Sequence, residues 1–338
     1  MKKTSSHFLN FILFAVIIFS NYSFGKEFQK LFEITAPTNN VSNIDIVISK
    51  SFNDLVYRLT GDNNFRTIKK IAPDMKTKKD FLVSYEPITI NDESFLLSKF
   101  NKDSLIKKLN ELEIPVIGYN RPITMLLIKI DDGKHPPYIL NSSSNKLLDE
   151  NIKYILNKTS NKRGIFFELP VFDLNDLEEL NNLTIFDSEK EIILSNYEYD
   201  YELNLQLSQP FINQWIITGD LNQDEFQTLD SILLDLEKNL NTITDNYLTN
   251  FFIPNISNSI NISVSNINSY DEFVGFQEAL NRLISIRDIK MTSYNNSSIS
   301  YTFIIRGDLE SFIKEVNANL DLQVINVEED FISIELNN

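Results

Sequence analysis

Hydrophobic residues in the first third of the chain follow strand and helix spacings in turn. Ser51 precedes a set of apolar positions at helical spacing and Gly61 follows it, which predicts a helix with its N-cap and its C-terminal end. Two Phe- and Ile-rich runs flank a polar turn at 91–93 and predict a hairpin. The elements expected here are a strand at 44–48, a helix at 52–59, hairpin strands at 81–90 and 95–100, and a helix at 103–112.

The middle of the chain contains a nearly continuous apolar run, 123–130, which is typical of a strand buried on both faces. The alternation of strands and helices around it predicts an open α/β sheet with helical crossovers. This fold extends over 43–220, as one domain or as two subdomains at 43–113 and 114–220. The elements expected after the run are a helix at 146–157, a strand at 164–169, helices at 175–180 and 187–195, and strands at 199–207 and 215–218.

Residues 221–250 are predicted to form one long amphipathic helix. Its apolar residues recur at alternating spacings of three and four, which places them in one stripe along the helix. The stripe either binds a partner, as in a coiled coil, or belongs to a helix that packs on the protein's own sheet or bridges two domains. We favour the second interpretation, because only about three heptads are present. The stripe consists of Phe226, Leu229, Leu233, Leu236, Leu240, Ile243 and Tyr247.

The last part of the chain begins after an Asn- and Ser-rich stretch that predicts a linker at 251–259. Beyond it, over 260–338, strands and helices follow the order βαββαβ, which is the ferredoxin-like arrangement. Residues 331–336 are expected to add an edge strand. The fold class expected for the whole chain is therefore an α/β domain, a long helix and an α+β domain.

The first 25 residues have the three-part layout of a secretory signal peptide. A basic start is followed by an apolar run at 8–19 and by small residues at Ser23 and Gly25. The run is shorter than the roughly 20 apolar residues that span a bilayer, so cleavage near Gly25 is favoured over a membrane anchor. The mature chain is expected in the periplasm, without a membrane span and with a flexible N-terminus at 26–42.

Charge and composition narrow the classes of partner. The 47 acidic residues outnumber the 31 basic ones, for a formal net charge of −16, and such a chain repels nucleic acid and anionic lipid head groups. The chain has no cysteine, which excludes a disulfide framework and cysteine catalysis. We expect no cofactor, because no Gly-rich phosphate loop accompanies the predicted strands.

Metal binding and triad catalysis find little support in the sequence. His135 is the one histidine outside the predicted leader, and it follows Asp131 and Asp132 in a turn. A zinc site needs further nitrogen or sulfur ligands, and a Ser-His-Asp triad needs a nucleophile on a strained turn. Neither accompanies His135, so we expect a solvent-facing turn and no metal.

Arg121 has the strongest case for a binding role. It lies just before the apolar strand, where the N–H groups of its planar guanidinium can donate two hydrogen bonds to a carboxylate. It either anchors an acidic ligand or clamps Asp131, Asp173 or a carbonyl of its own chain, and we favour the clamp. The candidate binding residues are therefore Arg121, Asp131, Asp132 and Asp173. Glu168 and Asp173 are also the acids that a glycan hydrolase would pair, although an edge-facing acid and a helix cap explain them more simply.

Three stretches resemble one protein family in their order and spacing. They are 55–62 (LVYRLTGD), 115–133 (PVIGYNRPITMLLIKIDDG) and 163–176 (RGIFFELPVFDLND). Together they are similar to the domain of unknown function 2066 family, exported proteins of Gram-negative, mostly gammaproteobacterial, bacteria. The string of Arg-Pro, apolar strand and Asp-Asp-Gly is the most specific part. The resemblance implies a periplasmic or envelope location, and it implies no activity.

Three functions remain open from the sequence. The first is a non-enzymatic adaptor or assembly factor that binds another envelope protein through its surface. The second is a hydrolase that uses paired carboxylates on a cell-wall or glycan substrate, and the third is a binding protein that holds a small acidic ligand with Arg121. An exposed apolar patch would favour the first, a deep pocket with converging acids the second, and a pocket floored by Arg121 the third.

Overall fold

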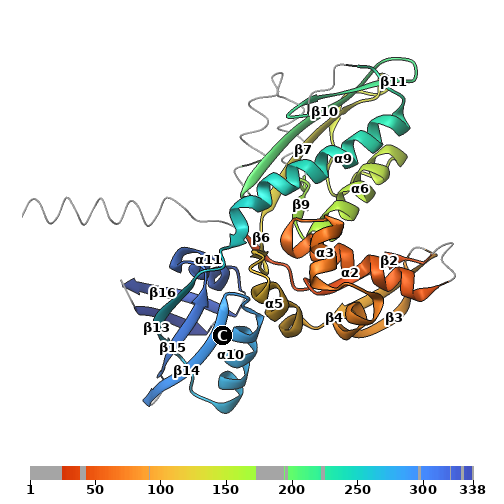
Figure 1. Cartoon of the computed structure of the whole chain (residues 1–338). Helices are drawn as coiled ribbons and strands as arrows, with labels where there is room; N and C mark the ends of the chain where they lie inside the picture. The colour runs from red at the N-terminus through yellow and green to blue at the C-terminus, as the bar shows by residue number, and fades with distance from the viewer. Residues whose placement is uncertain are drawn as a thin grey trace, which may run out of the picture.

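The computed structural model describes residues 25–38, 43–90, 92–172, 194, 197–221, 225–295, 298–319, 321–328 and 331–336. These residues form a mixed α/β protein in which three larger sheets, each with helices of its own, extend from a common centre (Figure 1). Within the described ranges, no helix is long and apolar enough to cross a membrane.

The N-terminal unit is a three-stranded antiparallel sheet with helices packed against it. Its strands are β2 (Glu33–Pro37), β4 (Glu93–Phe100) and β3 (Leu82–Ile90), paired in that order. The pairing of β3 with β4 confirms the predicted hairpin, and Asp92 in its turn has a φ of +63°. The helices are α2 (Ile44–Thr60), α3 (Phe65–Ile71), α4 (Met75–Asp80) and α5 (Lys102–Glu111).

Helix α2 begins earlier than the sequence suggested, so the strand predicted at 44–48 and the N-cap predicted at Ser51 are wrong. Asn43 caps the helix, and its side chain accepts a first-turn backbone N–H at 2.9 Å. Apolar residues of 44–48 pack on β2 and β4, so burial overrides the strand preference of this β-branched run. The predicted end at Gly61 is confirmed, with a φ of +68°.

The predicted flexible N-terminus is ordered over the residues that the structure describes, so that prediction is wrong. β1 (Lys26–Glu27) pairs with β6 (Asn120–Arg121), and β2 pairs with β4. Leu31 is fully buried and Phe32 is 7% exposed, both in the core of the N-terminal unit. These apolar side chains stabilise a stretch whose polar neighbours suggested a solvated tail.

The central sheet is built on the apolar strand that the sequence predicted, now β7. β7 is parallel to β9 and β10 and antiparallel to β8, in the order β11-β10-β7-β8. The helices predicted at 175–180 and 187–195 lie almost entirely outside the described residues. The elements are β7 (Ile123–Asp131), β8 (Tyr138–Ile139), α6 (Leu147–Arg163), β9 (Phe166–Glu168), β10 (Tyr201–Phe211) and β11 (Gln214–Gly219).

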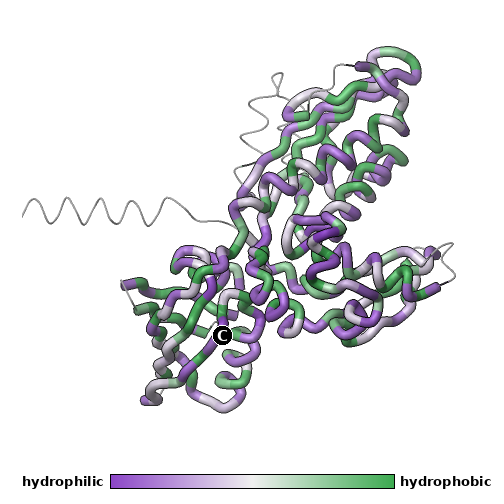
Figure 2. Tube along the Cα trace, viewed as in Figure 1, coloured by the Kyte–Doolittle hydropathy of each residue, from purple (hydrophilic) through white to green (hydrophobic). Residues whose placement is uncertain are grey.

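Helix α9 (Leu229–Leu248) lies beside α6 on one face of the central sheet (Figure 1). Leu236 and Leu240 are fully buried against this sheet, so the predicted stripe packs on the protein's own strands and the partner-binding interpretation is wrong for these two residues. Hydrophobic stretches run through the sheet and both helices in Figure 2. Of the other stripe residues, Leu229, Leu233 and Ile243 are partly buried, Tyr247 stacks on Tyr201, and Phe226 precedes the helix and is exposed.

The predicted linker at 251–259 is wrong at both of its ends. β12 (Phe252–Ile253) pairs with β5 (Val116–Ile117), and Ile253 is buried in the core of the N-terminal unit. β13 already begins at Ser257. Short strand pairings with distant residues therefore hold a stretch that composition alone marked as a connection.

The C-terminal unit is a five-stranded sheet in the order β14-β15-β13-β17-β16. β17 lies inside the sheet, parallel to β13, and β16 is at the edge, so the edge strand predicted at 331–336 is wrong. Ile332 and Ile334 of β17 are fully buried, whereas Ile325 of β16 is 54% exposed, which explains the placement. The elements are β13 (Ser257–Ser265), α10 (Tyr270–Arg282), β14 (Ile286–Asn295), β15 (Ser298–Arg306), α11 (Leu309–Ala318), β16 (Leu322–Glu328) and β17 (Phe331–Leu336).

Candidate functional site

Arg121 of β6 is fully buried and donates four hydrogen bonds to backbone carbonyl oxygens. Its Nε donates to Gly118 at 2.7 Å, its Nη2 to Ile117 at 3.1 Å, and its Nη1 to Arg58 at 3.2 Å and Arg163 at 3.1 Å. Burial, followed by the charges of the two neighbouring arginines, lowers the pKa of Arg121 well below its usual value. An acidic ligand has no surface of this side chain to bind, so the ligand-anchor hypothesis is wrong here and the side chain clamps carbonyls.

Two of the four carbonyls that Arg121 binds, those of Arg58 and Arg163, lie at the C-terminal ends of helices α2 and α6. α2 and α6 both stop at a glycine with left-handed backbone, Gly61 at a φ of +68° and Gly164 at +67°. Arg58 and Arg163 lie in the last turns of these helices, where the helix dipole favours positive charge. We call Arg58, Arg121 and Arg163 the arginine junction.

The arginine junction also holds β2 and α9. Nη1 of Arg58 donates to the carbonyls of residues 30, 31 and 33, at 3.0, 3.0 and 2.8 Å. Arg163 lies over the ring of Tyr57 at 3.9 Å and forms an ion pair with Asp245 of α9 at 2.8 Å. The Tyr57 hydroxyl donates to the same carboxylate at 2.8 Å, and burial raises the pKa of Tyr57 to about 12. These contacts give the junction a structural role.

Asp131 and Asp132 lie at the far end of β7, roughly 30 Å from Arg121 by the rise of an extended strand. Asp131 accepts the backbone N–H of Gly133 at 3.1 Å, and Asp132 accepts that of His135 at 2.8 Å. Nδ1 of His135 lies 2.7 Å from Asp132 Oδ2, and this contact is the main cause that lowers the pKa of Asp132 well below its usual value. The structure therefore separates Arg121 from both aspartates.

The β10–β11 hairpin ends beside these aspartates, since Ser208 of β10 is in register with Asp131 of β7. Phe211 and Ile212, at the turn of this hairpin, are 59% and 90% exposed. Phe226 is 48% exposed, and its ring centroid lies 5.6 Å from that of Phe211. We call this set the distal tip, since the hairpin points away from the C-terminal unit (Figure 1). It consists of Asp131, Asp132, Phe211, Ile212 and Phe226.

The hairpin that carries the distal tip is uncharged. No Asp, Glu, Lys or Arg occurs from 203 to 219, in a chain with 23% charged residues. When a partner covers this hairpin, no charged side chain of the hairpin has to lose its hydration. Dehydration of charged groups is the largest free-energy cost of burying a polar surface. Asp131 and Asp132 at its base place negative charge beside this uncharged surface.

Some residues that matter here were not found from the sequence. A signal for Ile212 existed, because an apolar pair stands before Asn213 in a connection where turn residues are expected. No signal marked Arg58 and Arg163, since arginines are mostly exposed and a single sequence does not distinguish the buried ones. Asp173, the remaining predicted binding residue, lies outside the described residues.

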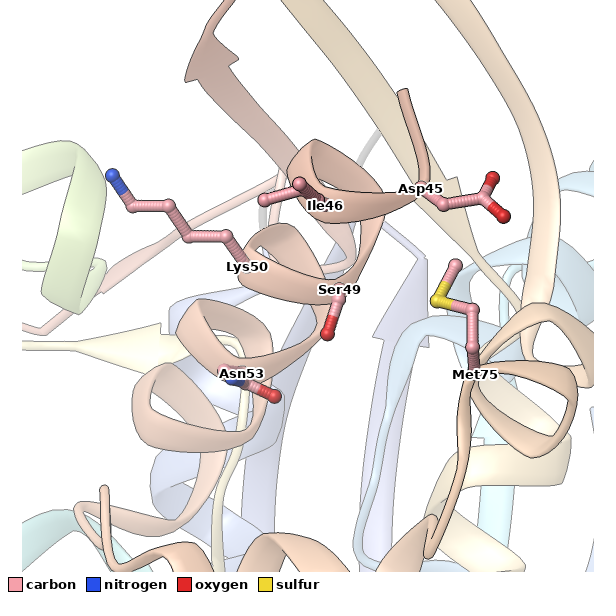
Figure 3. Close-up of a pocket in the computed structure, with 6 residues that line it drawn as sticks. All are labelled: Asp45, Ile46, Ser49, Lys50, Asn53 and Met75. Carbon is pink, nitrogen blue, oxygen red and sulfur yellow. The ribbon is translucent and has the colours of Figure 1, made fainter. Parts of the chain in front are cut away.

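An open groove of about 460 Å³ lies on the outer side of α2. Figure 3 shows that the side chains of Asp45 and Lys50 in its wall point in opposite directions. Nζ of Lys78 donates to Ser49 and Asn53, both at 2.8 Å, so these polar groups are engaged with each other. The groove therefore offers a shallow surface without converging catalytic groups.

The acid considered for a hydrolase, Glu168, lies in β9 with its side chain 36% exposed, 3.9 Å from the amino group of Lys26. Within the part of the chain that the structure describes, no three His, Cys, Asp or Glu residues gather closely enough to hold a metal ion. Asp173, the acid that the hydrolase hypothesis pairs with Glu168, lies outside the described residues.

Comparisons with models of protein families, with curated proteins and with solved structures gave no match to this chain. The case for function therefore depends on the surfaces described above. The class that the described residues define is a mixed α/β protein of several sheets, with exposed apolar side chains at the distal tip.

Proposed function

We propose that the protein is exported to the cell envelope and acts there as a non-enzymatic adaptor or assembly factor that docks another envelope protein through its distal tip. The observation that carries this proposal is the 90% exposure of Ile212, beside Phe211 and Phe226, at the end of a projecting hairpin. Single exposed apolar residues are common on proteins, but large ones grouped on one projection resemble the anchors of binding interfaces.

The energetics of the tip support docking into an apolar pocket. Full burial of a Phe or Ile side chain contributes about 1.5–3 kcal/mol, so three such anchors provide a substantial driving force. Phe211 and Phe226 already contact each other edge to face, which limits the ordering cost on binding. The uncharged hairpin around them adds little desolvation cost.

Export to the periplasm is supported by the leader-like pattern and by the resemblance to the domain of unknown function 2066 family, which remains part of this proposal. In this proposal β1 begins at Lys26, directly after the cleavage site. The two other functions find no supporting observation among the described residues, because Arg121 is buried and Glu168 faces Lys26.

We also propose that the C-terminal unit is a ferredoxin-like domain with one added strand. In support, β13, β15 and β14 pair antiparallel, and α10 and α11 occupy the two positions that the βαββαβ order requires. The hairpin of β16 and β17 takes the place of the single fourth strand, with β17 next to β13.

Ile212→Ser is expected to weaken partner binding roughly tenfold or more and to leave the melting temperature unchanged. The side chain is 90% exposed, so folding loses nothing, whereas binding loses about 1.5–3 kcal/mol of apolar burial. A photo-reactive residue at Asn213 should give one crosslinked adduct in envelopes, and mass spectrometry should identify the adduct. The affinity of the purified partner for both forms then measures the loss.

Phe65→Ser is the matched control for this experiment, because Phe65 is 67% exposed on α3 of the N-terminal unit. It should retain both the adduct and the affinity. An adduct that persists in Ile212→Ser with unchanged affinity, or an equal loss in Phe65→Ser, would show that the distal tip is not the docking site.

A further inference from the structure

Gly25 lies against the side chains of Asn120 in β6 and Phe251. β1 follows directly and pairs with β6, and Phe28 donates its backbone N–H to the carbonyl of Tyr119 at 2.8 Å. Glu27 is 7% exposed and lies 3.3 Å from Arg282 of α10. Glu27 is therefore buried, Phe28 is half-buried, and the side chain of Lys26 remains exposed.

Asn120 of β6 has an amide oxygen without a hydrogen-bond partner among the described residues. The side chain is 8% exposed, and its amide nitrogen donates to the carbonyl of Lys314 at 3.3 Å. A buried acceptor that receives no hydrogen bond from a protein donor contributes less to the stability of the folded state than one that does. A donor placed at this oxygen would therefore stabilise the protein.

A cavity of about 40 Å³ adjoins Asn120 and is large enough for a small polar group. The carboxylate of Glu315 lies in its wall and is 3% exposed. Glu315 already accepts the backbone N–H groups of Ile284 and Ser285 at 2.8 and 2.9 Å, so it is held in place. A buried carboxylate and an unpaired amide oxygen make the environment favourable for a cation that carries N–H donors.

Gly25 brings the backbone up to this unpaired oxygen. A Cβ atom on residue 25 would overlap the amide oxygen of Asn120 and would lie 3.1 Å from the ring of Phe251, so any other residue here would have to displace the Asn120 side chain. The same glycine stands just before the cleavage site that the sequence predicts. The residue that covers the amide oxygen of Asn120 is therefore the last residue before the predicted cleavage site.

We propose that cleavage of the bond between Gly25 and Lys26 creates an internal ligand, because the new α-ammonium group of Lys26 docks on the amide oxygen of Asn120. A signal peptidase adds water across this bond, so Gly25 departs with the leader as a carboxylate and the Lys26 nitrogen becomes an ammonium with three N–H donors. Loss of Gly25 opens the space in front of the oxygen. The inference depends on the export and cleavage included in the proposed function.

The docked ammonium makes stability depend on pH in a defined direction. A free α-amino group has a pKa of about 7.7–8.0, and hydrogen bonding of its charged form raises that pKa in the folded state. The stabilisation is therefore complete below the pKa of the unfolded chain and disappears as pH rises through the higher folded pKa. The titratable groups of the elements around the site are the side chains of Lys26 and Glu27 on β1, Lys102 and Asp103 on α5, Tyr119 and Arg121 at β6, Arg282 on α10, and Lys314 and Glu315 on α11.

Two purified forms of the chain test this inference, one that starts at Lys26 and one that starts at Gly25, each released from a fusion without extra residues. The Lys26 form is expected to melt about 2–4 °C higher at neutral pH and to lose this advantage above a pH of about 10. Asn120→Leu should abolish the difference between the forms. Asn110→Leu should retain it, because Asn110 also has a buried amide oxygen without a partner but lies on α5.

Equal melting temperatures of the two forms would overturn the docking, and so would a difference that persists in Asn120→Leu or at high pH. N-terminal sequencing of the protein from envelopes tests the cleavage separately. A start at Lys26 supports the inference, whereas an intact Met1 would overturn export itself. Failure of the docking alone would leave the adaptor proposal standing.

Discussion

Leu236→Ala is expected to lower the free energy of unfolding by about 2–5 kcal/mol, because a fully buried leucine loses its apolar contacts and leaves a cavity. Leu236 lies in α9 and packs in the same buried cluster as Leu203 and Leu205 of β10. The effect tests whether the long helix belongs to the core of the central sheet. Chemical unfolding of the purified variant and of the unaltered protein measures the difference.

Leu234→Ala is the matched control, since Leu234 lies in the same helix and is 69% exposed. It should change the free energy of unfolding by no more than about 0.5 kcal/mol. If Leu236→Ala proved as mild as Leu234→Ala, the helix would not pack on the sheet, and the partner-binding interpretation of the stripe would return.

Arg121→Ala is expected to cost about 2–4 kcal/mol of folding free energy, since it removes the buried donor of four carbonyl oxygens. Relief of repulsion with Arg58 and Arg163 offsets part of the loss. Arg121→Lys should restore only part of the stability. The lysine ammonium has one nitrogen, which cannot reach all four carbonyl oxygens that the three guanidinium nitrogens bind. Thermal and chemical unfolding of the three forms measures this order.

Arg66→Ala provides the control for a charge change without burial, because Arg66 is exposed on α3 and should leave the melting temperature nearly unchanged. One outcome would reverse the interpretation that Arg121 has a structural role. If Arg121→Ala melted like the unaltered protein and yet abolished envelope function, Arg121 would be a binding residue.

The elements predicted well are those with local signals. The hairpin of β3 and β4 follows from a polar turn between two apolar runs, and the end of α2 follows from Gly61. The long helix follows from its apolar spacing, and α9 begins at Leu229, within the predicted range. Each signal depends on backbone or spacing preferences within a few residues, which a single sequence displays completely.

The wrong predictions share a different cause. The start of α2, the N-terminal segment and the order of β16 and β17 all depend on partners far away in the chain. A β-branched run such as 44–48 is compatible with strand or helix, and the sheet it packs against decides between them. The sequence contains these partners but does not show which of them meet.

The candidate site also combines features that have local sequence signals with features that depend on distant partners. The turn predicted after the buried strand is present at Asp132, which accepts the backbone N–H of His135, whereas Asp131 is still the last residue of β7. Their position at the base of the β10–β11 hairpin was not predictable, since it follows from the parallel register of β10 on β7, which pairs Asp131 with Ser208. The distal tip therefore exists only once the central sheet has assembled.

By itself, the sequence determined the acidic, cysteine-free character of the chain, the buried strand β7 and the long helix α9, because composition and short-range spacing suffice for these. The tertiary structure decided that Arg121 clamps two helix ends, that the apolar stripe faces its own sheet, and that an uncharged hairpin projects Ile212 into solvent. The physical reason is that burial is a property of pairs of distant surfaces, and only the assembled fold determines which surfaces are covered.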